Sequence, residues 1–355
     1  MAYKTWCCDR DNMILLLGAS GYVGQAFSDE LRRRRWSYIP LTRRAIDYTS
    51  FDILFDYIRK IRPEFIINAA GCAPNPNVDA CETAREEALC ANALLPQTIA
   101  RACLMTNTPW GHVSSGSIYA GAKVAERGRM RIEKDLNQPE IRTLFAEQPE
   151  IFYGFTEWDE PNFSFQRAPC NFYSGTKALA EEAIRGVGQN YIWRPRMLFN
   201  ERDEPRNLLT KIQNYDRVYD NVNSITHLDE FVRACLGLWE RQAPFGIYNV
   251  VNPGAVTTRQ IVEMIRQFLN PDRDFEFWEN DEEFYRCRAK TPRSNCILDP
   301  SKLLARGVKM RPVEEALEDA LDRWRTASTF AGFAPAGIHL AAAAGLEMPG
   351  RRLHL

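Results

Sequence analysis

Several features of specialised proteins are scarce in this 355-residue sequence. It has four histidines, and its ten cysteines form no paired CxxC motif, so no metal site is expected. No apolar run approaches about 18 residues and residues 1–12 are polar, which argues against a membrane span and a secretory signal. The net charge of −1 gives no electrostatic reason to expect nucleic acid as a partner. We therefore expect a cytoplasmic protein that binds neither nucleic acid nor membranes.

The rest of the composition is ordinary for a globular enzyme. Apolar residues make up 45% and charged residues 26% of the chain. The length suffices for one large domain or two coupled domains with a substantial core. The scattered cysteines fit reduced thiols in a cytosolic protein.

A glycine-rich turn follows the first apolar run. Residues 13–17 predict a buried strand and residues 25–35 predict a helix, with a GxxGxxG turn between them. Such a turn permits close approach of a pyrophosphate, and the helix N-terminus offers free N–H groups. The alternative is a simple turn between a strand and a helix. The cofactor candidates in the turn are Gly18, Ser20, Gly21, Tyr22, Val23 and Gly24.

The end of the second predicted strand, at residues 36–41, bears on the choice of nicotinamide cofactor. No acid stands about 20 residues after the glycine turn, where a ribose-binding carboxylate is expected. Arg43 and Arg44 stand there instead, and guanidinium groups suit a 2′-phosphate. The pattern favours NADPH and leaves NADH open, and the two arginines could also be a solvated basic turn.

Strands and helices then alternate along the chain. We expect helices at residues 51–61 and at 82–105, the latter with a kink or break at Pro96, and strands at 64–71, 109–119 and 191–199. This order predicts an α/β fold with a doubly wound parallel sheet. Ligands collect at the carboxyl ends of such strands. The residues at or near those ends include Gly18, Asn68, Ala69, Ala70, Ser115 and Arg196.

Tyr173 and Lys177 lie four residues apart in a predicted helix at 173–184, so they share one face. A phenol with its ordinary pKa of about 10 is a poor proton donor or acceptor at neutral pH. A nearby ammonium is expected to lower that pKa, which would make the pair a proton-transfer device for a carbonyl or alcohol. The same spacing also occurs by chance on many helices.

Together these motifs resemble the extended short-chain dehydrogenase/reductase superfamily. Within it the chain is similar to the sugar-nucleotide group, near the dTDP-4-dehydrorhamnose reductases and the reductase part of plant-type UDP-rhamnose 3,5-epimerase/4-reductases. The resemblance covers about residues 13–325. The further matching stretches are residues 77–82, 159–163, 205–212, 252–254 and 292–295.

The resemblance implies a role for each matching residue. Ser115 would polarise the substrate carbonyl, Tyr173 would donate the proton, and Lys177 would hold the nicotinamide ribose, although Ser114 could be the closer hydroxyl. Cofactor contacts are implied for the glycine turn, Arg43, Arg44, Asn68, Ala69, Ala70, Tyr173, Lys177 and Arg196. Substrate contacts are implied for Ser115, Ser117, Asn207, Lys211 and Arg293. Ser117 could instead only cap a turn, and Arg293 could form a structural ion pair.

Two departures from relatives narrow the expected reaction. Dehydratases of the superfamily carry Thr-Asp-Glu where this chain has Ser115-Gly116-Ser117, so 4,6-dehydration is not expected. The bifunctional epimerase/reductases have a cysteine at the Ser117 position and a basic residue corresponding to Lys211. A serine hydroxyl is far less acidic than a thiol, whose pKa is about 8.5, so Ser117 puts epimerisation in doubt.

The resemblance also implies a division into domains. A dinucleotide-binding domain is expected from residues 13–199 and 226–251, and a smaller substrate-binding domain from 200–225 and 252–325. Residues 326–355, rich in alanine, glycine and proline, are expected to be a weakly ordered tail. A charged, helix-prone insertion at about 123–148 could be a lid, an oligomer contact or a solvated excursion.

The leading hypothesis is an NAD(P)H-dependent reductase of a nucleoside-diphosphate 4-keto-6-deoxy sugar, with a homodimer allowed. One alternative is a sugar-nucleotide epimerase that retains NAD. The other is a non-catalytic, reductase-like regulatory subunit that binds a partner protein.

Overall fold

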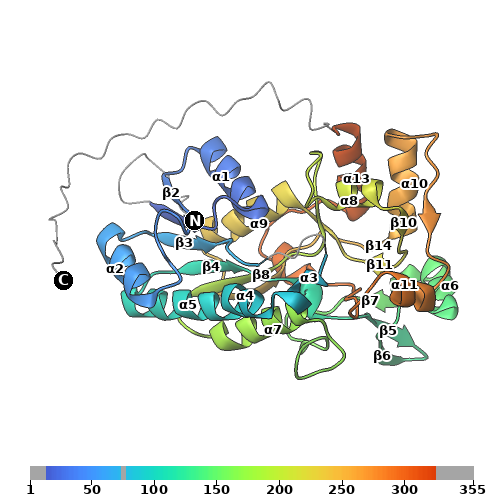
Figure 1. The fold of residues 1–355 in the computed structure, drawn as a ribbon, viewed down its shortest axis with the longest axis horizontal. Helices are drawn as coiled ribbons and strands as arrows, with labels where there is room; N and C mark the ends of the chain where they lie inside the picture. Colours follow the sequence, from blue (N-terminus) through green and yellow to red (C-terminus); the bar gives the residue numbers. More distant parts are fainter. Residues whose placement is uncertain (1–12, 73–76, 325–355) are drawn as a thin grey trace, which may run out of the picture.

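The computed structural model describes residues 13–72 and 77–324. At its centre lies a six-stranded sheet in which every neighbouring pair is parallel (Figure 1). The predicted doubly wound parallel sheet is confirmed. In spatial order its strands are β2 (Tyr38–Leu41), β1 (Ile14–Leu17), β3 (Phe65–Asn68), β4 (Trp110–Val113), β8 (Asn190–Arg194) and β13 (Gly246–Asn249).

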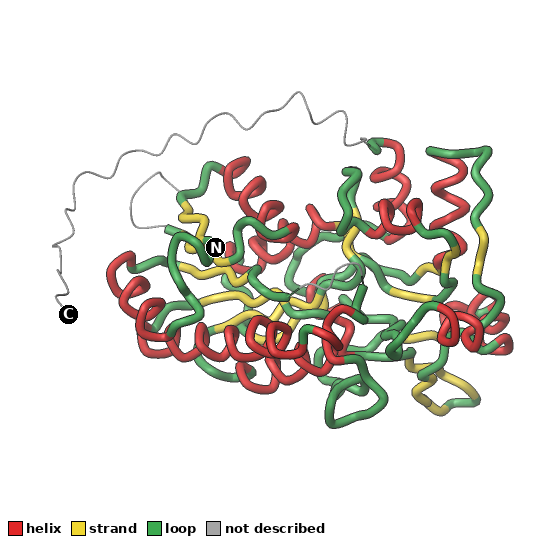
Figure 2. Tube along the Cα trace, viewed as in Figure 1, coloured by secondary structure: helices red, strands yellow, loops and turns green. Residues whose placement is uncertain are grey.

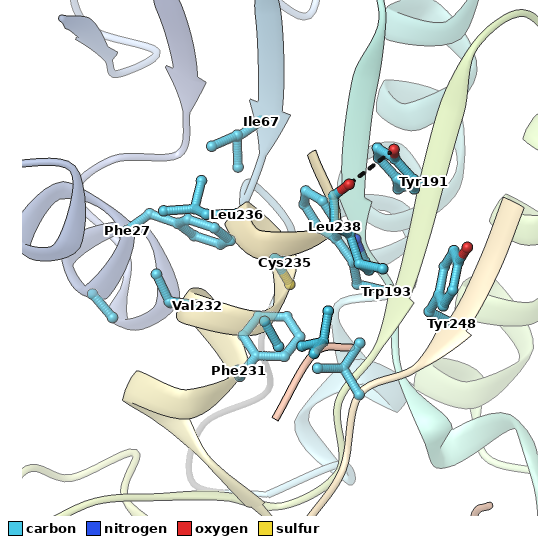
Figure 3. Packing of buried hydrophobic residues seen from close by; sticks show 14 of the residues in the cluster. Phe27, Ile67, Tyr191, Trp193, Phe231, Val232, Cys235, Leu236, Leu238 and Tyr248 are labelled. Atoms are coloured by element: carbon cyan, nitrogen blue, oxygen red, sulfur yellow. Dashed lines mark hydrogen bonds between the residues drawn. The ribbon is translucent and has the colours of Figure 1, made fainter. Parts of the chain in front are cut away.

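Helices cover both faces of this sheet because its strands are apolar on both sides. Ile14 and Leu16 of β1 belong to the core under α1 (Tyr22–Arg34) and α9 (Leu228–Glu240). That core also holds aromatic side chains of β8, and the Tyr191 hydroxyl donates to the carbonyl of Leu238 (Figure 3). Leu15 and Leu17 face the opposite core. The helices of that side are α2 (Phe51–Ile61), α5 (Leu95–Thr106) and α7 (Phe172–Ile184).

The strand order reverses direction between β1 and β3. After β1 the chain adds β2 on one side, and the α2 connection then carries it past β1 to β3 on the other side. The carboxyl ends of β1 and β3 therefore flank a crevice, which is the usual ligand position in an open α/β sheet.

The helical segment before β4 differs from the prediction. α3 (Ala80–Thr83) and α4 (Arg85–Leu89) lead into a π-helical segment, Cys90–Leu94, which continues directly into α5. Pro96 does not break the helix: it lies in the first turn of α5, directly after the π-helical segment. The stretch Arg85–Thr106 is long and apolar enough to cross a membrane by length and composition, but half of its apolar window is buried in the fold, as in a core helix.

A separate hydrophobic core lies beside the sheet. Its buried residues come from two stretches of chain, 199–225 and 256–321. Along the sequence, one stretch precedes β13, the last strand of the sheet, and the other follows it. Its helices are α8 (Leu208–Asn214), α10 (Thr258–Phe268) and α13 (Val313–Asp322) (Figure 1). The proposed domain boundaries stay a prediction, and the tail at 326–355 falls outside the described residues.

The insertion is a small unit packed on this second part. We expected a helix in this insertion, and its second half contains one, α6 (Pro139–Glu147). The first half of the insertion instead forms a hairpin of β5 (Ala122–Glu126) and β6 (Arg129–Glu133). Its apolar side chains pack against Val222 and Ile297. The remaining short elements, separated by loops in Figure 2, are β7 (Phe152–Tyr153), β9 (Leu198–Phe199), β10 (Arg217–Val218), β11 (Val222–Asn223), β12 (Thr226–His227), β14 (Val256–Thr257), β15 (Glu276–Phe277), α11 (Asp281–Cys287) and α12 (Ser301–Leu304).

Candidate active site

A cleft of about 1500 Å³ runs along the carboxyl ends of the strands. One part of its lining comes from the turn after β1 and the loops after β2 and β3. Another part comes from α8, the segment 215–223 and the region around α11. The start of α7 and the ends of β4 and β8 also contribute. Residues from both cores therefore share one cavity.

Two glycines of the turn stand where the backbone packs too closely to leave room for a side chain. Gly18 has φ +75°, and a Cβ there would lie 2.5 Å from the backbone N of Ala70. A Cβ on Gly24 would lie 2.1 Å from the carbonyl oxygen of Gly18. α1 begins at Tyr22, after Gly21, which supplies no side-chain cap. The tight glycine turn and the uncapped helix N-terminus beside it suit the pyrophosphate of a dinucleotide.

Most of the predicted cofactor contacts line the cleft, with two exceptions. Ser20, Tyr22, Val23, Ala69 and Ala70 are on its wall. Gly24 and Asn68 lie behind it, outside the lining residues. The Asn68 amide binds Nδ1 of His112 at 3.0 Å and accepts a hydrogen bond from the N–H of Ala70 at 3.0 Å. Asn68 therefore shapes the turn that meets the cofactor.

Arg43 and Arg44 lie on the cleft wall just beyond β2. Both are exposed, and neither forms an ion pair within the described ranges. Two unpaired guanidinium groups at this place fit a 2′-phosphate better than a ribose hydroxyl.

Tyr173 and Lys177 lie one helical turn apart on α7 and both line the cleft. The helix start is fixed by Asn171, which accepts from the N–H of Ser174 at 2.8 Å and donates to the carbonyl of Pro292 at 2.9 Å. Ser115, two residues after β4, lies near enough to Tyr173 for its hydroxyl to act on the phenol. The three residues with predicted catalytic roles thus meet at one point of the wall.

The protonation of this group differs from the expectation. Burial raises the pKa of Tyr173, against the opposing effects of the Ser115 hydroxyl and of the charge on Arg196. Burial lowers the pKa of Lys177 to about 8, although Glu181 one turn further on favours the charged form. The prediction that Lys177 would lower the pKa of Tyr173 was wrong for this structure, because desolvation dominates. Tyr173 is held as a protonated phenol.

The structure distinguishes between the two neighbouring serines. Ser114 donates its hydroxyl to the carboxylate of Glu181, which also forms a buried ion pair with Arg194 at 2.6 Å. Ser115 points its hydroxyl toward Ser117, at 3.0 Å, and toward Tyr173. Ser114 is therefore committed to the core network, and Ser115 is the hydroxyl available to a substrate.

Two predicted substrate contacts have other partners. Arg293 lines the cleft, but both its Nη atoms lie 2.7 Å from the carboxylate oxygens of Asp79. Burial would raise the pKa of Asp79, but hydrogen bonds from Arg293 and Thr291 outweigh burial and lower it to about 2. Asn207 is buried outside the cleft lining. It caps α8 and donates to the carbonyls of Asn200 and Arg202, so its amide is not available to a substrate.

Other cationic and aromatic groups occupy the substrate side. Lys211 lines the cleft, and burial together with the neighbouring Arg206 lowers its pKa. Arg206 and Arg288 also line the cleft and have no carboxylate partner in the part of the chain that the structure describes. Arg217 stacks over Trp278 at 4.1 Å. Sequence reasoning missed Arg288 and Trp278 because no motif surrounds them, and Arg206 was visible only as part of a matching stretch.

Several known proteins are similar to this chain over most of its length. Residues 12–326 match the family model described as RmlD substrate binding domain. A bifunctional dTDP-4-dehydrorhamnose 3,5-epimerase/reductase of Arabidopsis thaliana is 30% identical over 304 residues, covering 85% of this chain and 90% of the relative. A trifunctional UDP-glucose 4,6-dehydratase/3,5-epimerase/reductase of the same plant is 30% identical over 309 residues, which are 87% of this chain. The chain spans 42% of that relative's length.

Solved structures with the same fold are more distant in sequence. The L780 UDP-rhamnose synthase of Acanthamoeba polyphaga mimivirus superposes with a TM-score of 0.73 at 22% identity, covering 88% of this chain and 99% of that one. A dTDP-4-dehydrorhamnose reductase of Bacillus anthracis in complex with NADP gives 0.67 at 19% identity, covering 88% and 98%.

Proposed function

Because the chain belongs to the RmlD substrate binding domain family, we propose that it is an NADPH-dependent reductase of a nucleoside-diphosphate 4-keto-6-deoxy sugar. The single observation that carries the proposal is the meeting of Ser115, Tyr173 and Lys177 on the wall of a cleft that begins at the glycine turn. The named activities of the relatives support the substrate class.

The residues of the cleft account for the chemistry of ketone reduction. A bound NADPH supplies a hydride to the ketone carbon. The oxygen then gains negative charge, and the Ser115 hydroxyl is placed to stabilise it by donating a hydrogen bond. Tyr173, kept protonated by burial, donates the proton that completes the alcohol. Lys177 donates to the carbonyl of Val113 at 3.2 Å, close to where the cofactor ribose is expected.

The direct test measures turnover. Purified protein is incubated with NADPH and a panel of UDP- and dTDP-linked 4-keto-6-deoxy sugars, and the loss of NADPH absorbance is followed. We expect reduction of at least one of them, with NADPH preferred to NADH and the product identified by NMR. Absence of cofactor oxidation with the whole panel would contradict the proposal.

The two alternatives predict other outcomes. An NAD-retaining epimerase would copurify with tightly bound NAD and convert a sugar nucleotide without net oxidation. A regulatory subunit would bind a stoichiometric protein partner and show no turnover. The intact Ser115 and Tyr173 favour the reductase over the regulatory subunit.

A further inference from the structure

Arg196 is a buried cation with no carboxylate partner. Its side chain is 5% exposed, and within the described residues it forms no ion pair. Arg194, two residues earlier on the same strand end, is equally buried but is neutralised by Glu181 at 2.6 Å. The guanidinium of Arg196 instead donates to neutral oxygens, namely Oδ1 of Asn223 at 2.7 Å and the carbonyl of Ser294.

An uncompensated charge in a protein interior is unfavourable. Desolvation costs several kcal/mol for an ion without a counter-charge, so buried arginines are usually paired. Neutral oxygens recover only part of this energy, and the Nε of Arg196 has no hydrogen-bond partner. A positive charge held in this way on the wall of a cleft favours any negative charge that forms nearby.

The remaining donor of Arg196 leads to the reacting group. Nη1 donates to the hydroxyl of Ser117 at 2.9 Å. The Ser117 hydroxyl lies 3.0 Å from that of Ser115, and the Ser115 hydroxyl acts in turn on the phenol of Tyr173. Hydrogen bonds therefore connect the charge of Arg196 through Ser117 to Ser115, the hydroxyl that the proposed reaction places at the substrate oxygen. We call Arg196, Ser117 and Ser115 the hydroxyl row.

We propose that Arg196 is a positioning residue that polarises the hydroxyl row and thereby stabilises the oxyanion formed at the substrate ketone. The proposal rests on the proposed reductase function. It assigns Arg196 to the substrate oxygen, whereas the sequence placed it among the cofactor contacts. It also gives Ser117 a role, which is to accept a hydrogen bond from Arg196 and to pass its effect to Ser115. A side chain that cannot accept a hydrogen bond would lose this role.

The role requires no proton from Arg196. The ketone carbon receives the hydride from NADPH, which becomes NADP⁺, and the ketone oxygen receives the proton of Tyr173. Arg196 stays charged throughout. With its hydroxyl oriented by Arg196, Ser117 can donate to Ser115 when Ser115 turns its own proton to the substrate, so the row strengthens as negative charge develops.

The test compares Arg196→Gln with wild-type enzyme on the sugar that wild-type reduces. We expect kcat to fall about 10²-fold with KM changed by less than about threefold, since the stabilised charge exists only in the transition state. We also expect the alkaline limb of the kcat profile to move to higher pH. Tyr173 must be protonated to act, and removing a positive charge raises its pKa further. The other groups that act on Tyr173 are Ser115, Cys72 and Cys81, which the variant leaves in place.

Three controls make the result decisive. Arg185→Gln removes an exposed arginine at the end of α7 and should change neither kcat nor the alkaline limb. Guanidinium added to Arg196→Ala should restore part of the activity. Ser117→Ala should lower kcat about tenfold, and combining it with Arg196→Gln should cost no more than Arg196→Gln alone, because both act through one row.

Specific outcomes overturn the inference. Suppose that the wild-type enzyme reduces a sugar. If Arg196→Gln then keeps the wild-type kcat, Arg196 is not a polarising group. The same conclusion follows if the variant loses activity with neither a shift of the alkaline limb nor rescue by guanidinium. Fully additive losses in the double variant would also contradict it. Failure of wild-type itself would count against the reductase function and not against this inference alone.

Discussion

The two sides of the cleft are built from different material. The cofactor side is made largely of backbone: a glycine turn, the start of α1 and the small residues after β3, all within the first three strands and two helices of the chain. The substrate side is made of long side chains from α8, α11 and the loops near residues 217 and 293. Backbone features are fixed by local sequence, whereas side-chain constellations depend on how distant segments pack. Cofactor binding is therefore expected to tolerate side-chain changes but not the replacement of a glycine. Substrate binding is expected to depend on the individual side chains and much less on glycines.

The largest effect is expected where the two sides meet. Tyr173→Phe removes the proton donor and should lower kcat by about 10³-fold with little change in cofactor affinity. Steady-state kinetics and NADPH titration by fluorescence would measure both. Tyr153→Phe, at an exposed tyrosine of the β5–β6–β7 sheet, serves as the control. A Tyr173→Phe enzyme with near wild-type kcat would show that another group delivers the proton.

Gly18→Ala tests the backbone side. Its Cβ would meet the backbone of Ala70 at 2.5 Å, so we expect a loss of about 3 kcal/mol in the free energy of unfolding and weaker NADPH binding. Gly128→Ala is a matched control: φ is +76° there, but nothing lies within 4 Å, so only the backbone cost of about 1 kcal/mol applies. Urea unfolding of the two variants measures the difference, and equal losses would remove the steric argument.

The Asp79–Arg293 pair tests the side-chain part. The folded pKa of Asp79, about 2, lies below its unfolded value of about 3.9, so the pair stabilises the protein above pH 4 and this contribution is lost as pH falls toward 2. Asp79→Asn should cost about 2 kcal/mol at pH 7 and much less near pH 2.5. Urea unfolding at both pH values measures this, and a loss independent of pH would exclude the ion pair as its cause.

The smallest effect is expected for cofactor choice. Replacing both Arg43 and Arg44 by alanine should lower kcat/KM for NADPH about tenfold and leave that for NADH nearly unchanged, because only NADPH carries the 2′-phosphate. Equal losses with both cofactors would assign the arginines to another task. Lys60→Ala, on the exposed side of α2, controls for the loss of surface charge.

Much of the fold was predictable from local patterns. The strand–turn–helix at Gly18 and the helix that carries Tyr173 were placed within a few residues of their observed bounds. Both depend on short-range rules of apolar runs, glycine and capping. The hairpin in the insertion was missed although its strands alternate, with Ala122 and Val124 buried in β5 and Met130 and Ile132 set between charged residues in β6. The high charge of the segment had favoured a helix instead.

The sequence by itself determined the alternation of strands and helices that predicts the parallel sheet, the glycine turn and the Tyr173–Lys177 spacing, because each is written in short stretches of chain. Only the tertiary structure decided which charges are free. In the folded chain Arg293 pairs with Asp79, and Arg194 pairs with Glu181. Ser114 donates to Glu181 in the core, whereas Arg196 donates to Ser117 and has no carboxylate partner among the described residues. Charge compensation is a property of residues far apart in the chain, and desolvation, which sets the pKa of Tyr173, exists only once the chain has folded.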